Sequence, residues 1–199
     1  MRRVVLMISV SLDGFIEGPN REIGWHLVDD ELHRHFNDEL RDAGAFLDGR
    51  ITYELMADYW PTADADPAAS DPVVEFARIW REMPKIVYSR TRERADWNTT
   101  VARDVIPAHI MALKVLPGGD LFVGGAALAA TFMREHLIDE YRIYIHPVVL
   151  GAGKPLFAAG GPKIALRLTE ARTFRNGVVL LRYEHLADQP ATLSTSSVR

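Results

Sequence analysis

The sequence predicts an α/β protein with three layers, in which a mostly parallel central sheet ends in antiparallel C-terminal strands. From the N-terminus to about residue 136, apolar runs alternate with segments of helical spacing, which is typical of a parallel sheet. Beyond that point residues 141–146 alternate apolar and polar side chains, as a strand with one buried face does. Asn176-Gly177 then separates two further apolar runs and is a strong hairpin signal.

The expected elements follow one another with short loops, so the chain reads as one domain over residues 1–187 and a polar tail over 188–199. Residues 15–23 and 61–70 are rich in loop-forming residues, and we expect irregular loops there. The predicted strands are 4–10, 45–47, 85–89, 99–102, 141–146, 164–173 and 178–185, and the predicted helices are 29–43, 50–59, 71–83, 107–115 and 126–136.

Composition excludes several classes of function. A net charge of −4 without a basic run does not favour a nucleic-acid surface. The absence of cysteine excludes disulfides and thiolate metal sites, and we expect no metal. No long apolar stretch or signal-like segment occurs, which predicts a cytoplasmic protein without a membrane partner.

The most informative stretch is 120–128, where a short apolar strand passes through Gly124-Gly125 into an alanine-rich helix. Two adjacent glycines let a ligand approach the main chain, and the free N–H groups of a helix N-terminus attract anions. A phosphate or diphosphate is the natural ligand of such a turn. The alternative is that the two glycines only form a tight connection between strand and helix.

Other apparent motifs fail on their spacing. Gly151-Ala152-Gly153 begins like a dinucleotide fingerprint, but Leu156 stands in place of the third glycine and Pro155 blocks the following helical turn. His33 and His35 lie on nearly opposite faces of the first predicted helix, so they do not bind one metal ion. A solvated helix surface is the expected place for both histidines.

Four stretches in one order nevertheless resemble a known family, the dihydrofolate reductase-like fold, and within it the group that includes the reductase domain of riboflavin biosynthesis. The likeness extends from about residue 4 to 185. It rests on Ser11-Leu12-Asp13-Gly14-Phe15-Ile16, Gly49-Arg50-Ile51-Thr52-Tyr53-Glu54, Val87-Tyr88-Ser89-Arg90 and Phe122-Val123-Gly124-Gly125-Ala126, with the segment from Pro147 to Phe157 following later.

The resemblance implies NADPH as the cofactor. It places the phosphates against Gly49, Thr52, Gly124 and Gly125 and against the helix start Ala126, Ala127 and Leu128. Arg50 is expected at the adenosine 2′-phosphate, with Ser89 and Arg90 on the opposite wall. Taken singly, both arginines also fit ordinary surface charges. In this family the peptide between the two glycines is expected to be cis, and Ala127 stands where some folate reductases carry a further arginine.

The same resemblance places the substrate pocket between the first strand, the loop after it and the first helix. Ile16 is expected to line the nicotinamide, and Ser9 and Trp25 are expected at the substrate. Counting on from Trp25, Asp30 occupies the position of the carboxylate that promotes protonation of a pterin ring. Because acidic residues are favoured in a first helical turn anyway, a purely structural role for Asp30 remains the alternative.

Together these features predict an NADPH-dependent reductase that transfers hydride to a C=N or C=O bond of a small heterocycle, either pterin-like or a ribosylaminopyrimidine. The second hypothesis is a nucleotide- or flavin-binding module of the same fold without turnover. Relatives of the riboflavin type pair through their C-terminal strands, so we expect a homodimer to which the tail contributes.

Overall fold

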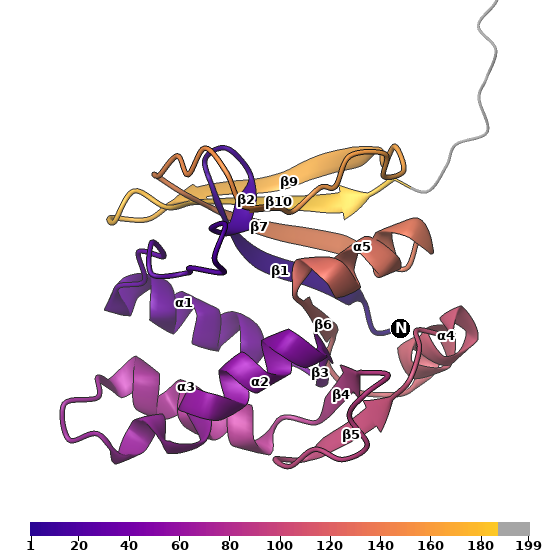
Figure 1. The fold of residues 1–199 in the computed structure, drawn as a ribbon, viewed down its shortest axis with the longest axis horizontal. Coiled ribbons are helices and arrows are strands. Elements are labelled where there is room, and N and C mark those ends of the chain that lie inside the picture. The colour runs from indigo at the N-terminus through magenta and orange to yellow at the C-terminus, as the bar shows by residue number, and fades with distance from the viewer. Residues whose placement is uncertain (187–199) are drawn as a thin grey trace, which may run out of the picture.

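The computed structural model describes residues 1–186, and the expected tail at 188–199 lies outside that range. An eight-stranded sheet runs through the described part in the order β5-β4-β3-β6-β1-β7-β10-β9 (Figure 1). All pairs from β5 to β7 are parallel, whereas β10 pairs antiparallel with both β7 and β9. The predicted fold class, with a parallel sheet and antiparallel C-terminal strands, is therefore confirmed.

Strand and helix bounds lie close to the predicted ones. The strands are β1 (Val4–Ser11), β2 (Phe15–Glu17), β3 (Ala45–Gly49), β4 (Lys85–Tyr88), β5 (Thr99–Ala102), β6 (Leu121–Gly124), β7 (Glu140–His146), β8 (Lys154–Pro155), β9 (Leu166–Thr173) and β10 (Val179–His185). The helices are α1 (Asp30–Leu40), α2 (Arg50–Tyr59), the 3₁₀ helix η1 (Trp60–Ala65), α3 (Asp71–Glu82), α4 (Pro107–Val115) and α5 (Ala126–Arg134).

Helices cover both faces of the sheet (Figure 1). On one face α1, α2 and α3 enclose a core that includes Phe46, Trp80 and Phe122. On the other face α4 and α5 pack over a core that includes Leu6 and Phe132. Strand β1 alternates its side chains between these two cores, so the centre of the sheet is apolar on both sides. This two-sided burial holds the strand ends in fixed positions.

Three expectations about the surface were wrong in detail. The region 15–23 contains β2, which pairs with β8, and the region 61–70 contains most of η1 with Pro61 and Ala63 buried. His33 and His35 are also buried, although we expected both in solvent. Helix α1 has neighbours on both flanks: His33 packs against Trp60 and Phe76, and His35 Nε2 lies 3.0 Å from the hydroxyl of Tyr144.

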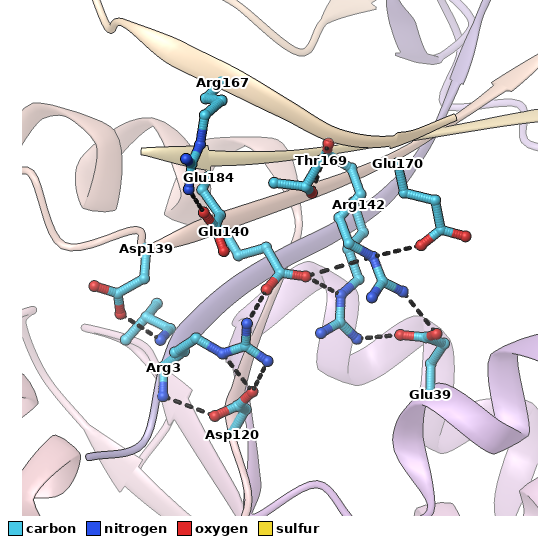
Figure 2. A network of polar contacts seen from close by, with 12 residues as sticks. Arg3, Glu39, Asp120, Asp139, Glu140, Arg142, Arg167, Thr169, Glu170 and Glu184 are labelled. Atoms are coloured by element: carbon cyan, nitrogen blue, oxygen red, sulfur yellow. Dashed lines mark hydrogen bonds and ion pairs between the residues drawn. The ribbon is translucent and has the colours of Figure 1, made fainter. Parts of the chain in front are cut away.

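The amino ends of β1, β6 and β7 carry a network of ion pairs (Figure 2). Arg3 pairs with Asp120 at 2.9 Å and with Glu140, whose side chain is only 2% exposed. Glu140 also accepts a hydrogen bond from Arg142 at 2.6 Å. The carboxylate of Glu39 on α1 then pairs with both Arg142 and Arg182. Each buried charge in this network therefore has an opposite charge beside it.

Within the described residues, no helix has both the length and the apolar character needed to cross a bilayer.

Candidate functional site

The carboxyl edge of the sheet brings two glycine-containing turns together. Strands β3 and β6 are parallel neighbours, with Asp48 of β3 opposite Gly124 of β6. Directly after that register, β3 leads through Gly49 into α2, and β6 leads through Gly125 into α5. Neither helix has a side-chain cap at its first turn. Two helix N-termini with free N–H groups thus begin side by side at one edge.

Close packing against Asp48 of β3 and Thr52 of α2 requires glycine at both position 124 and position 125. A Cβ on Gly125 would overlap the hydroxyl of Thr52, and Gly125 has φ = 85°, which other residues rarely adopt. A Cβ on Gly124 would overlap the carboxylate of Asp48. The expected cis peptide between these glycines is wrong, because every peptide bond in the described residues is trans. The positive φ of Gly125 makes the change of direction instead.

Asp48 is the residue at this edge that the sequence analysis missed. It belongs to β3 and is only 6% exposed, and its carboxylate takes part in no hydrogen bond or ion pair found within residues 1–186. Burial raises the pKa of its carboxyl to about 7, although the positive charge of Lys85 opposes that rise. The signal was an acidic residue at the end of the apolar run Ala45-Phe46-Leu47, where the predicted strand was ended two residues too early.

The predicted cations lie near this edge but their charges are paired elsewhere. Arg50 begins α2 and forms an exposed ion pair of 2.8 Å with Glu54, one turn further along the same helix. Arg90 follows β4 and pairs with Asp104 at 2.7 Å. Both pairs are on the surface, where ion pairs contribute little to stability and break easily. Either guanidinium is therefore available to a phosphate that offers a better partner.

The remaining residues predicted for the cofactor are placed as follows. Gly49 lies against α5, since a Cβ there would be 3.8 Å from the Cβ of Leu128. Ala126 and Leu128 are buried, whereas Ala127 is exposed. Ser89 is buried, and its hydroxyl accepts a hydrogen bond of 3.0 Å from the main chain of Arg92, so it stabilises the turn after β4.

Ser9 and Trp25 lie on the side of the sheet that carries α1. Ser9 is opposite Tyr144 in the β1–β7 register. Trp25 packs edge-on against His26 and His146, whose rings are stacked with centroids 5.2 Å apart. His146 Nδ1 accepts a hydrogen bond of 3.1 Å from the amide of Leu27. This contact ties the loop before α1 to the end of β7.

The two histidines beside Trp25 were also missed. Their Nε2 atoms are buried without a hydrogen-bond partner in the described residues. Burial lowers the pKa of His146 to about 4, helped by His26 nearby, and burial also lowers the pKa of His26. Both rings are consequently neutral at physiological pH. The sequence gives no periodic signal for this pair, because residues 26 and 146 meet only in the fold.

Asp30 is in the first turn of α1 and is exposed, with its carboxylate 3.2 Å from Arg34. The helix cap is the preceding residue, Asp29, whose side chain accepts a hydrogen bond of 3.0 Å from the amide of Leu32.

Ile16 in β2 packs against the core beneath α5. The structure therefore gathers Gly49, Thr52, Gly124 and Gly125 at one edge and leaves Asp30 apart, in a surface ion pair.

Comparison with known proteins assigns the chain to a family. The RibD C-terminal domain family matches residues 2–180. The chain belongs to this family. YyaP of Bacillus subtilis (strain 168) is 39% identical over 183 residues, which cover 92% of this chain and 94% of that protein. YwjB of the same organism is 29% identical over 182 residues, covering 90% and 96%.

Solved structures show that this member of the RibD C-terminal domain family shares the dihydrofolate reductase-like fold. A Shewanella sp. PV-4 protein assigned to riboflavin biosynthesis gives a TM-score of 0.71 at 21% identity, covering 94% of this chain and 100% of that one. A pyrimidine reductase-like protein of Corynebacterium diphtheriae gives 0.62 at 14%, covering 94% and 93%. Dihydrofolate reductase of Enterococcus faecalis, complexed with NADP(H), gives 0.61 at 13%, covering 92% and 96%.

Proposed function

We propose that the protein is an NADPH-dependent reductase that transfers hydride to a C=N or C=O bond of a small heterocycle, either pterin-like or a ribosylaminopyrimidine. The observation that carries this proposal is the meeting of two uncapped helix N-termini at Gly49 and Gly125, in a chain of the RibD C-terminal domain family. The solved neighbour complexed with NADP(H) supports the choice of cofactor.

The residues present fit a dinucleotide diphosphate in most respects. The missing Cβ atoms of Gly124 and Gly125 open the main chain, and the first amides of α2 and α5 are unused. Thr52 offers a hydroxyl next to Gly125. The acidic group that lies against this turn is the carboxyl of Asp48, next to Gly124. The site therefore suits an anion, provided that this one acidic group is neutral.

In the proposed reaction the nicotinamide, when bound, supplies the hydride. The chain's part is to hold and orient: the α2 and α5 amides bind the diphosphate, Ile16 lines the nicotinamide, and Ser9 faces the junction of cofactor and substrate. Asp30 is proposed to hold the proton that the reduced heterocycle takes up, which requires its carboxylate to leave Arg34. A homodimer joined through the C-terminal strands is part of the same proposal.

The proposal is tested by following nicotinamide absorbance when purified protein, NADPH and a panel of pterins and ribosylaminopyrimidines are mixed. We expect saturable NADPH binding and oxidation with at least one member of the panel. Saturable binding without oxidation across the panel favours the alternative, a nucleotide- or flavin-binding module without turnover. No binding of NADPH at all contradicts the proposal.

Cofactor choice is tested separately through Arg50. Replacing Arg50 by Ala removes the cation proposed for the 2′-phosphate, so NADPH affinity should fall by about tenfold while NADH affinity changes little. Arg34→Ala is the matched control, because Arg34 also forms an exposed helical ion pair but lies on α1. Equal losses for NADPH and NADH would contradict the role of Arg50.

A further inference from the structure

The position of Asp48 conflicts with a site for an anion. Its carboxylate occupies the space beside Gly124 that a Cβ would fill, and it lies in the register next to the start of α5. A bound diphosphate carries negative charge at every pH near neutral. If Asp48 were ionised at the same time, two negative charges would share one small region with little water between them.

In the described part of the chain, few positively charged groups lie near Asp48 to stabilise its ionised carboxylate. Strand β6 presents only the main chain of Gly124, and α2 presents the neutral Thr52. Strand β4 contributes Lys85, which is the one charged group within residues 1–186 that acts noticeably on Asp48. The ammonium of Lys85 is itself bound by the main-chain carbonyls of Trp80, Met83 and Trp97, so it does not form an ion pair with Asp48.

The helix N-termini are the other source of positive potential, and a diphosphate uses the same source. Without ligand, the partial charges at the starts of α2 and α5 favour the ionised carboxylate of Asp48. When a diphosphate occupies those amides, that support is lost and repulsion replaces it. At a separation of roughly 6 Å and an effective dielectric constant of about 20, such repulsion increases the proton affinity of a carboxyl by roughly a hundredfold.

We infer that Asp48 takes up one proton from solvent when the diphosphate of a dinucleotide binds at Gly124-Gly125, so that coenzyme binding is coupled to pH. This inference rests on the proposed function, since it needs a dinucleotide at the glycine turn. The carboxylic acid formed no longer repels the phosphates. Because burial already raises the pKa of Asp48 to about 7 in the free protein, the coupling falls in the neutral and mildly alkaline range.

Calorimetric titration in buffers of different ionisation enthalpy measures this proton uptake directly. We expect about 0.8 proton taken up per coenzyme at pH 8, much less at pH 5.5, and an affinity that falls by about fivefold per pH unit between about pH 7 and 9. NADPH and NADH are titrated in parallel, because only NADPH has a 2′-phosphate that titrates near neutral pH. Proton uptake at Asp48 is expected with both coenzymes. Any proton exchange at the 2′-phosphate occurs with NADPH alone.

Asp48→Asn replaces the carboxyl by a neutral group of the same shape. We expect this variant to bind NADH with a pH-independent affinity, about tenfold tighter than the wild type at pH 8, and without proton uptake. Asp58→Asn is the control, since Asp58 is an exposed acid near the C-terminal end of α2, away from the glycine turn. It should leave the proton uptake unchanged.

The possible outcomes distinguish failure of the inference about Asp48 from failure of the proposed function. Saturable binding of NADH to the wild type at pH 8 with negligible proton uptake overturns the inference alone, and this arm does not depend on any variant folding. Uptake that persists in Asp48→Asn assigns the proton to another group and also overturns it. Absence of NADPH and NADH binding even at pH 6 overturns the proposed function, and the inference with it.

Discussion

The two edges of the sheet differ in whether their buried charged side chains have partners of opposite charge. At the amino edge the buried side chains of Glu140 and Arg142 pair with each other, and Glu140 also pairs with Arg3, in the network of Figure 2. At the carboxyl edge the carboxylate of Asp48 is also buried but has no partner in the described part of the chain, and the helix N-termini beside it have no side-chain cap. Unpaired buried charge is costly. The contrast agrees with our proposal that the carboxyl edge serves binding, whereas the amino edge serves stability.

The largest loss of stability is expected when the central carboxylate of the amino edge, that of Glu140, is removed. Glu140→Gln leaves the buried guanidinium of Arg142 with a weaker partner and Arg3 with one fewer, so we expect a loss of about 3–5 kcal/mol in the free energy of unfolding. Denaturant titration measures the loss. Glu184→Gln is the control, because its pair with Arg167 is exposed and should contribute less than about 1 kcal/mol. Similar losses in both variants would contradict the distinction between buried and surface pairs.

The carboxyl edge is tested most sharply at Gly125. Gly125→Ala adds a methyl group that overlaps the hydroxyl of Thr52, and we expect NADPH affinity to fall by about a hundredfold because the turn and its amides shift. Gly151→Ala is a matched control. Gly151 also has a positive φ, 73°, but its added Cβ meets nothing within 4 Å. Equal losses of affinity would mean that general strain, and not the site, explains the effect.

The same comparison predicts how stability depends on pH. The pKa of Asp48 is raised to about 7 in the folded chain, so the folded state keeps a proton that the unfolded state has lost above about pH 4. This group therefore lowers stability as pH rises from about 4 to 7, and the loss is complete above that range. Asp48→Asn should be more stable than wild type by about 4 kcal/mol at pH 8, with a smaller difference at pH 5. A difference that is constant with pH would show that Asp48 is already ionised across this range.

Most of the fold followed from local patterns in the sequence. The alternation of apolar runs and helical segments gave the parallel sheet, and Asn176-Gly177 gave the hairpin of β9 and β10. Gly49, Gly124 and Gly125 were recognised because glycine has a distinct conformational role at a tight turn. These features depend on residues close together in the chain.

What could not be predicted depends on contacts between distant residues. The burial of His33 and His35 follows from η1, α3 and β7 packing beside α1, and the stack of His26 on His146 follows from a loop folding back on β7. Asp48 looked like the end of a strand until its neighbours on β6 and α2 were known. Spacing alone cannot tell a solvated polar residue from one enclosed by a second element.

The central claim is that the amides beside Gly124-Gly125 bind the diphosphate of a dinucleotide. Titrating NADPH into isotope-labelled protein and following the backbone amide resonances tests it most directly. We expect saturable shifts at Gly125, Ala126 and Thr52, with resonances of the Glu140 network unchanged. Saturable shifts confined to residues away from the starts of α2 and α5, or no shifts at all, would contradict the claim.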